Sequence, residues 1–203
     1  MIVLHTPAVW HYHVRLMAAD TKCYITADQL LEDSFRLGTQ VFDSGFRPSF
    51  IVGVWRGGTP VGIAVQELLD FFGVETDHIA IRTSLYTGIN ERAAQIKVHG
   101  LQYMVDTIDQ NDGLLVVDDV FDSGQSIDAV VTELRSRARR NTPKDIRIAT
   151  VYYKPDNNET DRVPDYYVHE TDKWLVFPHE LTGLTADEIR EHKRGCAAFL
   201  DRL

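Results

Sequence analysis

Three carboxylates directly follow an apolar run in the stretch LLVVDDVFDSGQSID, which spans residues 114–128. Asp118 and Asp119 are adjacent, and Asp122 follows them in the same stretch. Two adjacent carboxylates at the end of a strand can accept hydrogen bonds from the hydroxyls of a vicinal diol, or bind Mg²⁺ largely through water. A carboxylate further into the loop, such as Asp122, can take or give a proton at a bound base.

The residues that follow the carboxylates suit a tight turn that holds a phosphate. They are Ser123, Gly124, Gln125 and Ser126. Consecutive backbone N–H groups, two hydroxyls and a glycine, placed at the start of a helix, can form a phosphate cradle. The stretch is not a Walker A loop, because it has no GK[ST] sequence. The alternative is that the acids only solvate a strand end and cap a helix, which fits a single Asp better than this ordered string.

Strands and helices must alternate along the chain to position these residues. Apolar runs predict strands at 50–55, 78–82, 114–117 and 146–153, with shorter candidates at 166–168 and 174–177. Helical periods and capping residues predict helices at 26–42, 59–72 and 126–140, and a last one from 185 onward. This alternation indicates an α/β fold, a parallel twisted sheet flanked by helices, with ligands at the carboxyl ends of the strands.

Two further stretches could contact a ligand at those strand ends. Arg56, Gly57 and Gly58 follow the strand 50–55 and could supply backbone N–H groups and one positive charge to a pyrophosphate. An ordinary glycine turn with an exposed arginine explains them equally well. Lys154 could donate to an exocyclic oxygen and Trp174 could stack on a heterocycle. By themselves, they read more simply as a solvated strand end and a core residue.

Composition and charge exclude several classes of protein. The chain has 203 residues and a net charge of −9, so broad electrostatic binding to nucleic acid is not expected. Its two cysteines, Cys23 and Cys196, form neither a disulfide framework nor a zinc ligand set, and they fit a reducing compartment. The first residues lack the pattern of a signal peptide, and no apolar stretch would span a bilayer. We therefore expect a cytoplasmic protein without a membrane partner.

The stretch VVDDVFDSGQS resembles the phosphoribosyl-pyrophosphate signature of the type I phosphoribosyltransferases. That signature is a short apolar strand, two acids, two apolar residues, an acid, then Thr or Ser, Gly, any residue, and Thr or Ser. The resemblance implies that Asp118 and Asp119 hold the ribose hydroxyls and Mg²⁺, and that Asp122 is catalytic beside the purine N7. It assigns the 5′-phosphate to Ser123, Gly124, Gln125 and Ser126.

The carboxyl-terminal part resembles the 6-oxopurine branch of that family, especially the xanthine-guanine enzymes. In those enzymes a Lys-Pro precedes a W-x-x-x-P-x-[DE] segment, as it does here in WLVFPHE. The resemblance implies that Lys154 contacts the purine O6 and that Trp174 stacks on the base. It also implies that Leu175 and Val176 contact the edge of the base, and that Glu180 lies on the metal–pyrophosphate side. Val176 is apolar where an acid can occur, and Glu180 replaces the commoner Asp. The preference among hypoxanthine, guanine and xanthine therefore stays open.

The resemblance also implies a pyrophosphate loop and a lid. The loop comprises Arg56, Gly57 and Gly58, and because some members hold a peptide bond there cis, we expect the Arg56–Gly57 bond to be cis or strained. The lid would be the polar segment 83–98, which shows no steady period, with Ser84 and Tyr86 as its functional residues. In some members the Ser and Tyr are adjacent, whereas here one residue separates them.

We expect four parts along the chain: an amino-terminal segment 1–25 that is left unassigned, a core 26–153 that includes the lid loop 83–98, a base-binding hood 154–184 and a carboxyl-terminal helix 185–203. The implied substrates are phosphoribosyl pyrophosphate and a purine base, as in purine salvage, and the implied assembly is a homo-oligomer, either dimer or tetramer. Two alternatives remain. One is a non-catalytic regulator of the same fold that senses phosphoribosyl pyrophosphate. The other is an enzyme for another base, such as adenine or orotate.

Overall fold

The computed structural model describes residues 22–86, 95–193 and 195–200. Its centre is a six-stranded sheet in the order β4-β3-β2-β5-β6-β7, in which neighbours pair in parallel except for the antiparallel pair β3–β4. The strands are β2 (Phe50–Trp55), β3 (Asp77–Tyr86), β4 (Gln95–His99), β5 (Gly113–Phe121), β6 (Asp145–Tyr153) and β7 (Tyr166–Glu170). Because β2, β5 and β6 are parallel neighbours, the residues that follow them meet at one edge of the sheet.

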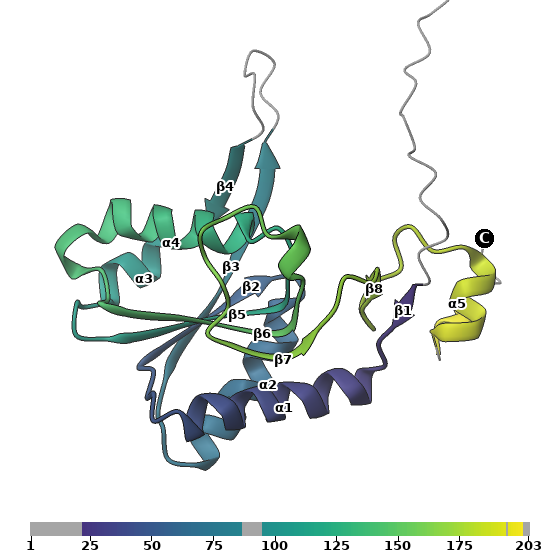
Figure 1. Cartoon of the computed structure of the whole chain (residues 1–203), viewed down its shortest axis with the longest axis horizontal. Helices are drawn as coiled ribbons and strands as arrows, with labels where there is room; N and C mark the ends of the chain where they lie inside the picture. The colour runs from purple at the N-terminus through teal and green to yellow at the C-terminus, as the bar shows by residue number, and fades with distance from the viewer. Residues whose placement is uncertain (1–21, 87–94, 194, 201–203) are drawn as a thin grey trace, which may run out of the picture.

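Helices cover both faces of this sheet (Figure 1). One face carries α1 (Ala27–Asp43) and α2 (Gly58–Phe71), and the other carries α3 (Gln102–Thr107) and α4 (Gln125–Ala138). Strand β5 is buried on both sides. Leu115 and Val117 pack on the face covered by α1 and α2, and Leu114 and Val116 pack on the face covered by α3 and α4. A near-continuous apolar run is typical of such a strand. The expected α/β fold is therefore confirmed.

Both expected capping boxes form. At the start of α1, the Thr26 hydroxyl accepts from the Gln29 N–H at 3.2 Å, and the Gln29 side chain accepts from the Thr26 N–H at 2.9 Å. The same exchange joins Thr185 and Glu188 at the start of α5 (Ala186–His192). Each box satisfies N–H groups that the helix leaves without an internal partner, so the two helices begin where the sequence predicts.

A small hood stands beside the main sheet (Figure 1). Its two strands, β1 (Cys23–Tyr24) and β8 (Leu175–Val176), pair in parallel. Glu188 on α5 accepts hydrogen bonds from Lys22 at 2.6 Å and from Tyr24 at 2.8 Å. The described residues just before α1 thus contribute to the hood. The division into four parts stays a prediction. The short helices η1 (Arg139–Asn141), η2 (Pro155–Asn157) and α6 (Ala197–Leu200) complete the set.

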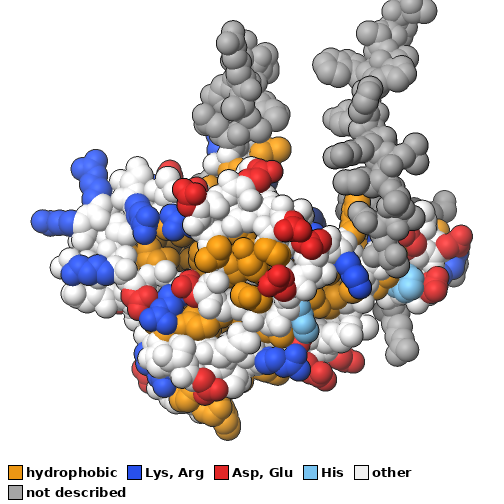
Figure 2. Space-filling view, in the orientation of Figure 1, with side chains coloured by type: hydrophobic (Ala, Val, Ile, Leu, Met, Phe, Trp, Pro, Cys, Tyr) orange, Lys and Arg blue, Asp and Glu red, His pale blue; other side chains and the backbone are white. Residues whose placement is uncertain are grey.

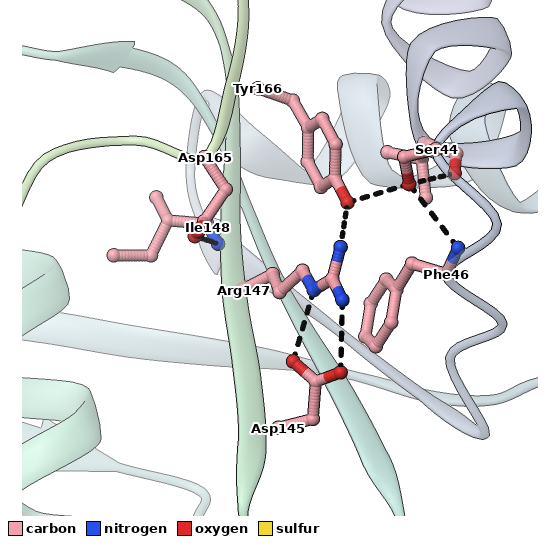
Figure 3. A network of polar contacts seen from close by, with 8 residues as sticks. Ser44, Phe46, Asp145, Arg147, Ile148, Asp165 and Tyr166 are labelled. Carbon is pink, nitrogen blue, oxygen red and sulfur yellow. Dashed lines mark hydrogen bonds and ion pairs between the residues drawn. The ribbon is translucent and has the colours of Figure 1, made fainter.

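A polar network closes the amino-terminal edge of the sheet (Figure 3). The Arg147 guanidinium donates to the Asp145 carboxylate at 3.0 and 3.1 Å and to the Tyr166 hydroxyl at 2.5 Å. The Ser44 hydroxyl, just after α1, lies 2.8 Å from the same Tyr166 oxygen. The hydrogen bond to Asp145 raises the pKa of Arg147, so the arginine stays charged. The side chains at this edge therefore join the starts of β6 and β7 to the end of α1.

Two stretches differ from the sequence expectation. The segment 83–98 is regular where it is described, because β3 continues to Tyr86 and β4 returns antiparallel to it; residues 87–94 lie outside the described part. Its irregular polarity arises because this pair lies at the sheet edge and presents side chains such as Leu85 to solvent. Helix α3 has six residues, too few to show a helical period. None of the described helices combines the length and apolar character needed to cross a bilayer.

Candidate active site

The phosphate turn joins β5 to α4, as the sequence predicts. Asp118 and Asp119 lie near the end of β5, and α4 begins at Gln125 directly after Gly124. Gly124 has a φ of 76°, in the left-handed region that favours glycine. A Cβ there would also lie 2.6 Å from the ring of Phe121. Both conditions favour glycine here, at the turn whose backbone N–H groups lead into the start of the helix.

The two adjacent acids lie near the end of β5, where Asp119 is 7% exposed and Asp118 is partly buried. Burial and the neighbouring charge of Asp119 raise the pKa of Asp118 well above its usual range. Burial raises the pKa of Asp119 to about 6, and the negative charge of Glu180 acts in the same direction, against a hydrogen bond with Asp118 that lowers it. One Asp118 oxygen accepts from the Asp119 N–H at 3.0 Å, which orients the first carboxylate. Such a pair favours partners that bring positive charge or hydroxyl donors.

The glycine loop after β2 packs directly against these acids. A Cβ on Gly57 would lie 1.9 Å from an oxygen of Asp119, and one on Gly58 would lie 2.4 Å from the Val117 carbonyl oxygen. Gly57 has an ordinary φ of −66°, which any residue can adopt. Glycine is therefore required here by the close approach of Asp119 and not by the backbone conformation. Arg56 is exposed beside it. The loop backbone therefore lies within reach of any ligand that the acids hold.

The expectation for the peptide bond in this loop was wrong by one residue. The cis bond joins Trp55 to Arg56, not Arg56 to Gly57. A cis bond without proline leaves no mark in the sequence, and its place is decided by the surrounding chain.

Asp122 is the centre of a second polar cluster. Its two carboxylate oxygens accept from the Lys154 ammonium at 3.1 Å and from the Asn157 amide at 2.8 Å. The register of β5 and β6 explains this meeting, because Phe121 pairs with Tyr153 and the next residues emerge side by side. Lys154 is 9% exposed. The structure thus joins the predicted catalytic acid to the predicted base-binding lysine. Asn157 was missed, because an asparagine in a polar turn carries no distinguishing pattern.

The surroundings of the phosphate turn include residues from β3 and the hood. The Thr83 hydroxyl, on β3, donates to that of Ser126 at 3.4 Å, a contact that the sequence analysis missed. The Gln125 side chain donates to Glu159. Ser84 lies 3.0 Å from a ring nitrogen of His99 on β4. The Tyr86 side chain lies outside the described part of the chain. The lid role of Ser84 and Tyr86 stays a prediction.

The hood residues divide by exposure. The Trp174 side chain is 61% exposed, so its ring is free to stack on a base. Leu175 and Val176 are 7% and 2% exposed and belong to strand β8. Direct side-chain contact with a base is therefore favoured for Trp174 and not for the two strand residues.

The carboxylates suit Mg²⁺ that arrives with a substrate. Among the described residues no three His, Cys, Asp or Glu side chains are arranged to hold a metal ion on their own. Glu180 accepts from the Phe177 N–H at 2.9 Å, and its charge reaches Asp119. Mg²⁺ commonly binds through one or two carboxylates, with water and substrate phosphates as the other ligands. Asp118 and Asp119 fit that requirement, since they are adjacent carboxylates near the end of β5.

A family comparison accounts for this arrangement. The model of the phosphoribosyl transferase domain matches residues 26–183. The chain belongs to this family. The matched range includes every residue singled out above as a site candidate, from the glycine loop to Glu180. The resemblance to the type I phosphoribosyltransferases is therefore confirmed.

Curated relatives and solved structures agree with this membership. Xanthine-guanine phosphoribosyltransferase of Cereibacter sphaeroides is 30% identical over 164 residues, which are 78% of this chain and 86% of the relative. Hypoxanthine-guanine phosphoribosyltransferase of Streptococcus mutans is 23% identical over 73% of this chain and 78% of its own. The crystal structure of a purine phosphoribosyltransferase from Pyrococcus horikoshii is 29% identical, with a TM-score of 0.61, and covers 81% of this chain and 97% of its own.

Proposed function

We propose that the protein transfers the 5-phosphoribosyl group of phosphoribosyl pyrophosphate to a 6-oxopurine, namely hypoxanthine, guanine or xanthine. The products are the nucleoside 5′-monophosphate and pyrophosphate, as in purine salvage. The contact between Asp122 and Lys154 beside the phosphate turn carries this proposal. A proton acceptor and an ammonium donor side by side are what N7 and O6 of a 6-oxopurine would require, which supports the proposal. The named activities of the curated relatives support the same reaction.

The sugar-phosphate would be held by the end of β5 and the turn after it. The backbone N–H groups of residues 123–126, with the hydroxyls of Ser123 and Ser126, bind the 5′-phosphate. Asp118 and Asp119 accept hydrogen bonds from the ribose hydroxyls. These contacts hold the ribose while the bond from C1 to the pyrophosphate oxygen breaks with oxocarbenium character.

The leaving group would be stabilised at the loop after β2. The N–H groups of Gly57 and Gly58 and the charge of Arg56 bind the departing pyrophosphate. Mg²⁺, held through Asp118 or Asp119 with Glu180 nearby, supplies further neutralisation of the negative charge when it is bound. Because the field of the whole chain is negative, these local contacts must supply the attraction.

The base would bind near Asp122, Lys154 and Trp174. Lys154 donates to O6, Asp122 manages the proton at N7, and the Trp174 ring stacks on the base. Asn157 holds the second oxygen of Asp122 and so orients the carboxylate. The segment 83–98 excludes water from the reacting C1, because water would otherwise capture the cation.

A pyrophosphate-release assay with a panel of bases tests this function. With phosphoribosyl pyrophosphate and Mg²⁺, we expect release with at least one of hypoxanthine, guanine and xanthine, and none above background with adenine or orotate. Adenine has no oxygen at C6 for Lys154 to meet. Binding of phosphoribosyl pyrophosphate without release under any base would contradict the enzymatic function and support the regulator. Release with only adenine or orotate would contradict the base assignment.

The proposal includes a homo-oligomer, dimer or tetramer, in the cytoplasm. Apolar side chains reach the surface (Figure 2), and the exposed large ones include Trp55 at 52%, Ile63 at 57% and Phe71 at 83%. Burial of such side chains against a second copy would remove apolar area from water. Light scattering coupled to size-exclusion chromatography should give a mass of two or four chains, and a single-chain mass would contradict it.

The cytoplasmic assignment is supported by the free thiols Cys23 and Cys196. Recovery in a membrane or secreted fraction would contradict it.

A further inference from the structure

His179 is held in place by a buried aromatic residue of the hood. Its ring is stacked on that of Phe177, with centroids 5.8 Å apart and planes 9° apart. Phe177 is 3% exposed and packs edge-on against Tyr152, with centroids 5.8 Å apart. Because Phe177 is fixed in the core, the position of the imidazole above it is also restricted.

The polar edge of this imidazole faces the acid pair. The His179 Nε2 atom lies 3.6 Å from Oδ2 of Asp119. The same Oδ2 atom lies 1.9 Å from the position that a Cβ on Gly57 would occupy. The imidazole nitrogen, the carboxylate and the backbone of the glycine loop therefore lie around one point, where the hood meets the end of β5.

The charges on both sides of this point act on His179. Burial lowers the pKa of His179, and the positive charge of Arg56 acts in the same direction. The negative charge of Glu180 acts in the opposite direction. Such effects require charges at short range. His179 is thus subject both to the cation of the glycine loop and to the carboxylate of the hood.

A pyrophosphate at this point would be stabilised by donors in addition to those of the loop. It carries several negative charges and would meet the carboxylates of Asp118, Asp119 and Glu180. An N–H group beside Asp119 can donate a hydrogen bond either to the Asp119 carboxylate or to a pyrophosphate oxygen. It would thereby reduce the repulsion between these two anionic groups.

We propose that His179 binds the departing pyrophosphate, with its Nε2–H facing Asp119 in the free protein and donating to a pyrophosphate oxygen in the complex. The role rests on the proposed function and adds to it a residue outside the glycine loop. His179 is then a contact of the leaving group, and its loss should affect pyrophosphate far more than the purine or the nucleotide.

Kinetics of the reverse reaction test this role. We compare His179→Phe, which keeps a flat ring over Phe177 and removes the N–H, with His179→Gln, which keeps a donor near the Nε2 position. The KM for pyrophosphate should rise on the order of 10- to 100-fold in His179→Phe, the range for losing a hydrogen bond to a charged group. The KM for the nucleotide should stay within about twofold. His179→Gln should recover most of the loss, because the donor is retained.

A second histidine provides a matched control. The ring of His169 is also stacked on an aromatic residue, Tyr152, with centroids 5.0 Å apart, and its Nε2 lies 2.7 Å from Asp33, which is 7% exposed. It lies on β7, away from the glycine loop, so His169→Phe should leave the KM for pyrophosphate unchanged. An equal rise in His169→Phe would overturn the proposal, since general loosening would then explain both.

Three other outcomes would also overturn the role of His179. They are an unchanged KM for pyrophosphate in His179→Phe, an equal rise in the KM for the nucleotide, and no recovery in His179→Gln. Failure of the proposed function has a different result, because the wild-type protein would then release no pyrophosphate in the base panel. An active wild type with an unaffected His179→Phe variant refutes the role of His179 alone.

Discussion

Asp122→Asn should lower the turnover number by about 10²- to 10⁴-fold, the usual contribution of a positioned general acid or base. Binding of phosphoribosyl pyrophosphate should stay within about twofold, because the phosphate turn and the acid pair are untouched. Asparagine keeps the shape of the side chain and one oxygen that can accept from Lys154 or Asn157. It cannot take the proton from the purine N7, so the loss falls on the chemical step.

Steady-state turnover and a direct binding titration of phosphoribosyl pyrophosphate measure the two effects separately. Asp156→Asn is the matched control, since this exposed residue of η2 loses the same charge close to the site. Its turnover should stay near that of the wild type. Unchanged turnover in Asp122→Asn would refute the acid–base role, and an equal fall in Asp156→Asn would attribute the effect to net charge.

Gly57→Ala should reduce kcat/KM for phosphoribosyl pyrophosphate by about 10²-fold, the cost of displacing a site by roughly 1 Å. The new Cβ would lie 1.9 Å from an oxygen of Asp119, so either the carboxylate or the glycine loop must move. Either movement separates groups that bind the ribose from groups that bind the pyrophosphate. The φ of −66° suits alanine, so the backbone itself should tolerate the change.

Gly62→Ala, within α2, is the control for this substitution. Its Cβ would meet its nearest neighbour, the Gly53 Cα, at 3.6 Å, an ordinary contact. Replacement of glycine by alanine inside a helix adds about 0.5–1 kcal/mol to the free energy of unfolding. We expect normal kinetics and a slightly higher melting temperature for Gly62→Ala. Wild-type kcat/KM in Gly57→Ala would show that the close approach of Asp119 has no part in catalysis.

Features set by neighbouring residues could be predicted from the sequence. The turn after β5 and the capping boxes at Thr26 and Thr185 are all confirmed. Each depends on side chains and backbone groups within a few residues of one another, so residue types and spacing contain the necessary information. The alternation of apolar and periodic stretches predicted the sheet and its covering helices for the same reason.

Contacts between distant segments required the tertiary structure. Strand order and register decide that Asp122 meets Lys154, and tertiary packing brings Asp119 against Gly57 and His179. They also pair β1 with β8, which no pattern in the short CY sequence of β1 indicates. The sequence by itself therefore determined which local turns and elements form, and with them the family signature. Only the packed sheet decided which groups share a site, because their distances depend on how separate strands align.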